Sequence, residues 1–233
     1  MSLGQLWPQP GLLAGYHLNA NSNDFSGSGY NGTDANITYA LGSIGGNGAS
    51  FNGSSSKIAL SSSLDTPLKT GSFTQVMIVK VPSSWTYIFG VCRGRVTSGS
   101  NYGIYFAIES AGITVQRCEG NATSYTKTLA TTISNNKKYF IVWTYDKSSG
   151  ATKIYCGCLE SSGVFVSDSA TFGTGNVSYH ASYDVGYNIG ANLRNVSDKY
   201  GWGVINEYLI FSDVKNDQWV RNYYTLLRGG LLS

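Results

Sequence analysis

The chain has 233 residues, of which 42% are hydrophobic and 12% are charged, and its formal net charge is +3. This charge is small and no basic run extends beyond Lys137 and Lys138, so the sequence lacks the positive surface that would bind nucleic acid or an anionic membrane. No stretch of about 18 apolar residues predicts a membrane span, and no basic segment before an apolar run predicts a secretion signal. The location of the protein therefore stays open.

The predicted elements are mainly short β-strands. The chain holds 17 Tyr, 9 Phe and 5 Trp residues but only 2 Met, which favours pleated sheets over helices. Runs of β-branched and aromatic residues bounded by turn-forming residues predict strands at 76–81, 87–91, 102–109, 113–118, 139–145 and 152–159. Their spacing is typical of an antiparallel sandwich. Both alternating faces of 139–145 are apolar, which predicts a central strand covered on both sides.

The two ends of the chain depart from this pattern. Residues 1–10 contain two prolines and predict an extended lead-in segment, which is followed by a single domain at residues 11–233. Residues 216–227 carry apolar side chains at helical spacing, beginning with Trp219 and Tyr223. We expect one short C-terminal helix here, capped either by Asn216 or by residues 212–213.

Four segments, in chain order, resemble one known family in its opening strand and glycine-rich loop, its edge-strand turn, its central strand pair and its last strand. They are Gly-Tyr-His-Leu-Asn and Asn-Asp-Phe-Ser-Gly-Ser-Gly-Tyr-Asn-Gly at 15–19 and 23–32, Gly-Ala-Ser-Phe-Asn-Gly at 48–53, residues 139–146 with 154–157, and residues 203–211 with 219–224. The sequence thereby resembles the laminin-G-like domains of the concanavalin A-like lectin and glucanase superfamily. This resemblance implies an all-β, two-sheet antiparallel jelly-roll sandwich.

The resemblance also implies a calcium site, because related jelly rolls often hold this ion with loop carboxylates and carbonyls. The matching positions are Asp24, Asn206 and Glu207, together with carbonyls of the loop at 27–32, and such oxygens suit a hard cation. Asn206 stands where the family commonly has Asp, so an amide replaces one carboxylate. The alternative is that Asp24 starts a turn and that backbone donors satisfy Glu207.

A second predicted site would bind a glycan. Sugars present apolar C–H faces between hydroxyl groups, so their sites combine aromatic rings with amide or charged groups. Such residues cluster at 179–202, and the predicted glycan-binding residues are Tyr183, Tyr187, Asn188, Asn192, Arg194, Tyr200 and Trp202. A further aromatic group that would line the concave sheet is Trp85, Tyr87, Tyr102, Tyr105 and Tyr125. The alternative for each ring is ordinary core packing.

The sequence shows no catalytic cluster. Glucanases of the superfamily use a Glu-x-Asp-x-x-Glu pattern that brings two carboxylates together, and this pattern does not occur. His17 and His180 have no metal-binding spacing around them. Cys156 and Cys158 share one strand face, where a disulfide between them would be strained, so we expect both to pack in the core. We therefore expect no enzymatic activity.

These observations predict a non-catalytic, lectin-like recognition module that binds a glycan or glycoprotein, for instance in adhesion to a cell-surface polysaccharide. The alternative is a structural protein of a virion or appendage, such as a phage tail or capsid decoration, whose jelly roll contacts other such proteins or copies of itself. The lead-in segment distinguishes the two hypotheses, because a docking arm would be buried against another chain.

Overall fold

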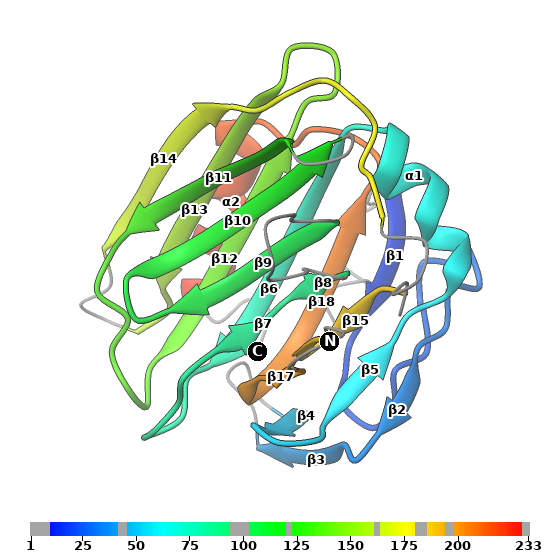
Figure 1. The fold of residues 1–233 in the computed structure, drawn as a ribbon. Coiled ribbons are helices and arrows are strands. Elements are labelled where there is room, and N and C mark those ends of the chain that lie inside the picture. The colour runs from blue at the N-terminus through cyan, green and yellow to red at the C-terminus, as the bar shows by residue number, and fades with distance from the viewer. Residues whose placement is uncertain are drawn as a thin grey trace.

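The computed structural model consists of two layers of β-sheet packed face to face, with one helix on the outside (Figure 1). It describes residues 10–41, 46–93, 103–119, 123–160, 164–179, 186–193 and 198–229. The strand pairings among these residues are antiparallel throughout. The predicted all-β, two-sheet antiparallel sandwich is therefore confirmed.

The first layer is an eight-stranded sheet. Its strands, in spatial order, are β14 (Phe165–Thr171), β13 (Ala151–Cys158), β12 (Lys138–Tyr145), β6 (Phe73–Lys80), β18 (Trp202–Phe211), β4 (Asn47–Asn52) and β3 (Thr38–Leu41), and β1 (Leu12–Tyr16) also pairs with β18. The central strands β6, β12 and β18 are buried along most of their length because apolar residues occupy both of their faces. The segment predicted as a doubly covered strand forms β12.

The second layer consists of two four-stranded sheets that meet at their edges. One contains β11 (Thr123–Ala130), β10 (Gly112–Glu119), β9 (Ile104–Glu109) and β7 (Ile88–Phe89), and the other contains β2 (Thr33–Ala35), β5 (Lys57–Ala59), β15 (Asn188–Ile189) and β8 (Val91–Cys92). Hydrogen bonds from Gly90 N to Phe106 O and from Arg93 N to Ile104 O, each 2.9 Å, join them. The predicted strand 87–91 is thus divided at Gly90. A ribbon of β16 (Ala191–Asn192) and β17 (Lys199–Tyr200) completes the fold.

Alternation along β9 shows which side chains reach each face of the second layer. Ile104, Phe106 and Ile108 point into the main core between the two layers. Tyr105 and Ala107 belong instead to a small cluster on the outer face. Successive side chains of a strand point to opposite faces, so Glu109, two residues after Ala107, also lies on the outer face of the layer.

Helix α2 (Asp217–Arg228) covers the outer face of the eight-stranded sheet and lies behind the sheets in Figure 1. The Asn216 side chain accepts a hydrogen bond from Trp219 N at 2.9 Å, so Asn216 is the cap of the two that were predicted. The helix packs on apolar residues of β6, β12, β13 and β18 and forms a second core with them. The predicted C-terminal helix is confirmed.

Two short helical segments lie outside the predicted elements. They are a 3₁₀ helix at Ser62–Leu64 and α1 (Asp65–Thr70), which follows it directly. Pro67 falls in the first turn of α1. Backbone N–H groups in a first turn have no acceptor within the helix, so a proline there costs no helical hydrogen bond. Across the described ranges, none of the helices has the length and apolar character needed to cross a bilayer.

The cysteines of the chain are free thiols: Cys92, Cys118, Cys156 and Cys158.

Candidate ligand-binding site

A pocket of about 300 Å³ lies where the chain enters β7 and where β9 turns into β10. Trp85, Thr86 and Tyr87 line it from the first segment, and Glu109 and Ser110 line it from the second. All five residues are half-buried or exposed. Their side chains are therefore within reach of a ligand from solvent.

The Trp85 indole is fixed by the loop that precedes β12. Trp85 Nε1 donates a hydrogen bond to Asn135 Oδ1 at 2.9 Å, and Asn135 Nδ2 donates to Ser83 O at 2.7 Å. The ring is thereby held in one orientation at the wall of the pocket. Such preorganisation lowers the entropy that ligand binding must remove.

The Tyr87 ring is held by an aromatic neighbour, Phe89, and by the ammonium of Lys199. It stacks on Phe89 with 5.4 Å between ring centroids and 10° between planes. Lys199 Nζ, from β17, donates to the Tyr87 hydroxyl at 2.7 Å and lies 4.2 Å from the ring centroid. The ammonium therefore adds a positive charge beside an aromatic face.

Glu109 brings a negative charge to the pocket. It follows Tyr105 by four residues on the same face of β9 and accepts a hydrogen bond from the Tyr105 hydroxyl. Tyr105 is only 2% exposed, so this bond ties a half-buried carboxylate to the sheet. A carboxylate fixed in this way is a strong acceptor for ligand hydroxyl groups.

Together the pocket offers two aromatic rings, a carboxylate and two hydroxyl groups, with the Lys199 ammonium next to Tyr87. Aromatic faces pack against apolar C–H groups, whereas the polar groups pair with hydroxyls. The arrangement therefore suits a ligand that presents C–H faces and hydroxyl groups side by side.

Three of the predicted glycan-binding residues lie in the interior. Tyr187, Asn188 and Asn192 are each 1% exposed, so they offer no surface to a glycan, and the prediction is corrected for them. The Tyr187 hydroxyl bonds to the Tyr179 hydroxyl, and the Arg93 guanidinium lies 3.6 Å from the Tyr179 ring centroid and 5.0 Å from that of Tyr187. Burial raises the pKa of both tyrosines, so the pair stays neutral and acts in packing.

Two other predicted residues, Tyr200 and Trp202, remain accessible. Tyr200 is half-buried in β17, and Trp202 is 38% exposed at the start of β18. The Trp202 indole lies against Gly53. A Cβ atom at residue 53 would be 2.0 Å from the indole ring, and the backbone of Gly53 has φ +72. Position 53 therefore favours glycine. Tyr183 and Arg194 lie outside the described residues.

The second predicted aromatic group is divided between the pocket and the interior. Trp85 and Tyr87 line the pocket, whereas Tyr105 is buried on the outer face of the same layer. Tyr125 stacks on Phe172 with 5.9 Å between ring centroids and packs against the main core. Tyr102 lies outside the described residues.

The Asp24 carboxylate, predicted as a calcium ligand, is used to close its own loop. It accepts four hydrogen bonds of 2.9 Å, from Gly15 N, Ser26 N, Ser26 Oγ and Tyr30 N. These donors occupy the lone pairs that a cation would need. The alternative role of Asp24, as a turn residue, is the one that this geometry matches.

The other two predicted calcium ligands also have different contacts. Asn206 Nδ2 donates to Asn47 O at 3.0 Å, and Glu207 Oε1 lies 3.0 Å from His17 Nδ1. Calcium needs six to eight converging oxygens, and nowhere in the described ranges do three His, Cys, Asp or Glu side chains form a group that could hold a metal. Each of the three predicted calcium ligands therefore contacts another group of the chain itself.

The buried Glu207 carboxylate gives a testable pH dependence. Burial raises its pKa above the usual value of 4.5, and the facing His17 only partly offsets this shift. Because the folded-state pKa is raised, the stability that protonated Glu207 contributes is present below about pH 4.5 and is lost as the pH rises through that pKa. Glu207→Gln removes the loss, so its unfolding free energy, measured in urea, should rise relative to wild type as the pH increases above about 4.5. A constant difference between the two proteins at all pH values would contradict this account.

The polar members of the pocket, Glu109, Thr86, Ser110 and Lys199, were not among the predicted site residues. One signal was present, because Tyr105 and Glu109 are four residues apart within a predicted strand and so share a face. The position of Lys199 beside Tyr87 depends on contacts between segments 112 residues apart. No local pattern predicts such a contact.

Comparison of the sequence with known family models gives no match, and comparison with curated proteins also gives none. Solved structures do match. Domain 4 of AbnA, a GH43 extracellular arabinanase from Geobacillus stearothermophilus, in complex with arabinotriose, aligns with a TM-score of 0.59 and 20% identity over 91% of this chain and 97% of that chain. The Ruminococcus gnavus IT-sialidase CBM40 bound to alpha2,3 sialyllactose aligns with a TM-score of 0.55 and 13% identity over 82% and 97%.

A phage protein is also similar. The enzymatically active domain of Bacteriophage CBA120 tailspike protein 2 aligns with a TM-score of 0.56 and 14% identity over 85% of this chain and 30% of that chain. At such identities a structural match concerns the fold, since one fold hosts many functions. The chain therefore shares the two-layered β-sandwich fold of these domains.

Proposed function

We propose that this chain is a non-catalytic, lectin-like module that binds a glycan on a cell-surface polysaccharide or glycoprotein. One observation carries the proposal: Trp85 and Tyr87 share a pocket with the Glu109 carboxylate on a β-sandwich. Sandwich domains of similar fold have been solved with arabinotriose and with sialyllactose, which supports the same ligand class here. The segment resemblance extends the proposal to the laminin-G-like group of this fold.

In the proposed complex, each part of the pocket has a separate role. The Tyr87 and Trp85 rings pack against the C–H face of a sugar ring, and Glu109 and Ser110 accept hydrogen bonds from its hydroxyls. Lys199 donates to an oxygen of the same sugar from beside Tyr87. A pocket of about 300 Å³ is small for a ligand site, which favours recognition of about one or two sugar rings.

The test starts with a glycan array, followed by calorimetric titration of the best ligand. Tyr87→Ala should weaken binding by about tenfold or more, or about 1.4 kcal/mol, because it removes an aromatic anchor. Glu109→Gln should weaken it less, because the amide still fills the pocket but accepts weaker hydrogen bonds.

The matched control is Tyr39→Ala, which removes a half-buried tyrosine of β3 in the other layer. It should leave the affinity unchanged. Trp202→Ala separates the pocket from the accessible aromatic residue at the start of β18. If Trp202→Ala abolishes binding while Tyr87→Ala preserves it, the pocket is not the glycan site.

A second candidate function is assembly within a virion or appendage, which the likeness to a phage tailspike domain favours. Such a protein would use the sandwich for contacts with its own copies or with neighbouring proteins. The proposed docking arm is the lead-in segment at residues 1–10, of which residues 1–9 lie outside the described residues. Its last residue is described, and Pro10 O accepts a hydrogen bond from Lys215 Nζ at 2.6 Å. Light scattering decides between the two candidates: a stable oligomer that binds no glycan on the array supports assembly.

A further inference from the structure

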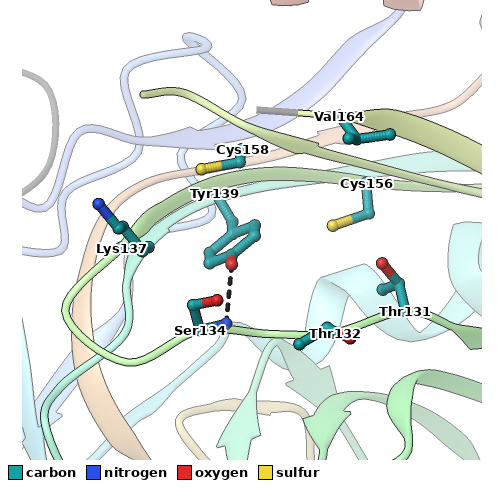
Figure 2. Close-up of a pocket in the computed structure, with 8 residues that line it drawn as sticks. All are labelled: Thr131, Thr132, Ser134, Lys137, Tyr139, Cys156, Cys158 and Val164. Carbon is teal, nitrogen blue, oxygen red and sulfur yellow. Dashed lines mark hydrogen bonds between the residues drawn. The ribbon is translucent and has the colours of Figure 1, made fainter. Parts of the chain in front are cut away.

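A second pocket, of about 370 Å³, lies between the segment that joins β11 to β12 and the strand β13. Figure 2 shows two thiols and an aromatic ring gathered on the pocket side of the strands. The lining residues are Thr131, Thr132, Ser134, Lys137, Tyr139, Cys156, Cys158 and Val164. The proposed glycan site uses none of them.

The two thiols come from one face of β13. Cys156 is paired with Ile141 and Cys158 with Tyr139 on β12, and both cysteine side chains pack toward the main core. Cys156 is 2% exposed, whereas Cys158 is half-buried nearer the solvent. One thiol therefore forms the inner wall of the pocket and the other lies closer to its mouth.

The distance between the two cysteines along β13 determines whether a disulfide or a bridging metal ion can link their sulfurs. Two residues along a strand separate their Cα atoms by about 6.6 Å, and two side chains on the same face run roughly parallel. A disulfide needs Cβ atoms within about 4.5 Å, so the pair does not close on itself without moving the backbone. A metal ion in line between two sulfurs spans about 4.6 Å at a typical metal–sulfur distance of about 2.3 Å, so binding requires the two parallel side chains to turn toward each other about χ1.

The number of ligands restricts the ion further. In the described part of the chain no third Cys, His, Asp or Glu joins the two thiols in a metal-binding group. Zinc and calcium need four or more ligands, whereas soft thiolates select Cu(I), which accepts two ligands in a line. Lys137 lines the same pocket, where its ammonium is paired with Glu160 at 2.5 Å.

We propose that Cys156 and Cys158 form a two-coordinate site for one Cu(I) ion. Binding forms two Cu–S bonds and releases the two thiol protons to solvent, and no oxidation or reduction is involved. This inference does not depend on the glycan proposal.

The test supplies Cu(I) anaerobically as its coloured bicinchoninate complex and follows the loss of colour as the protein takes the metal. Wild type should remove one equivalent of copper, and Cys156→Ala and Cys158→Ala should each lose this uptake. Cys92→Ala and Cys118→Ala are matched controls, because both residues are buried cysteines outside this pocket. Both controls should retain one equivalent.

A second readout uses the unmodified chain. Iodoacetamide labelling followed by mass spectrometry should show that Cu(I) protects Cys158, the half-buried thiol, from alkylation. This measurement still decides the question if Cys156→Ala does not fold. The proposal is overturned if wild type removes no copper, if Cys158→Ala removes as much as wild type, or if Cu(I) leaves the labelling of Cys158 unchanged.

Discussion

Arg117→Met is expected to lower the free energy of unfolding by about 3–5 kcal/mol, because it breaks a buried ion pair from one side. Arg117 is completely buried and donates hydrogen bonds to Glu119, to Gly175 O at 2.7 Å and to Lys69 O at 3.3 Å. Its removal leaves the Glu119 carboxylate, only 9% exposed, without its cation and with Gly175 N as its remaining donor, and it leaves the Gly175 carbonyl without the Arg117 hydrogen bond. Urea unfolding measures the loss directly.

Two further variants show whether the lost pairing is the cause. Arg117→Met combined with Glu119→Gln should recover part of the stability, because no unpaired charge is then left in the interior. Arg221→Met, on the exposed side of α2, should change stability by about 0.5 kcal/mol or less. If Arg117→Met alone unfolds at the same urea concentration as wild type, the Arg117–Glu119 ion pair does not support the fold.

Trp143→Ala is expected to cost a similar amount, about 3–5 kcal/mol, through the loss of packing and the cavity left behind. Trp143 has no exposed surface and meets Phe73 edge-on, with 4.8 Å between ring centroids, and Phe106 at 5.9 Å. Its Nε1 also donates to Thr152 Oγ1 at 2.8 Å. The residue thus joins the two layers at the centre of the main core.

Trp143→Phe is the matched control, because it keeps an aromatic ring and loses the hydrogen bond and part of the volume. Its cost should be clearly smaller than that of alanine. Thermal unfolding should rank wild type, phenylalanine and alanine in that order. Equal melting temperatures for the alanine variant and wild type would mean that Trp143 is not the central packing residue we describe.

The parts of the fold predicted from the sequence are those with a strong local signal. The segment at 139–145 has two apolar faces, which is the pattern of a strand between a core and a covering helix, and it forms β12. The stripe beginning at Trp219 predicts α2 in the same way. The strands β15, β16 and β17 are two residues long, which is too short for any periodicity to show.

The candidate site was predicted only in part, and two tyrosines show why. Tyr87 and Tyr187 both lie among turn-forming and aromatic residues, yet only the first reaches a pocket. Tyr187 is buried because β15, which follows it, pairs with β5 and β8, segments about 100 or more residues earlier in the chain. Residue type alone does not distinguish a ring that packs from a ring that binds.

The four donors that converge on Asp24 have a consequence for the environments in which the fold persists. In a loop closed by a metal, the conformation varies with the concentration of that metal in the medium. Here the loop is closed by N–H and O–H groups that belong to the chain itself. This corner of the sandwich should therefore keep the same shape in calcium-poor and calcium-rich surroundings.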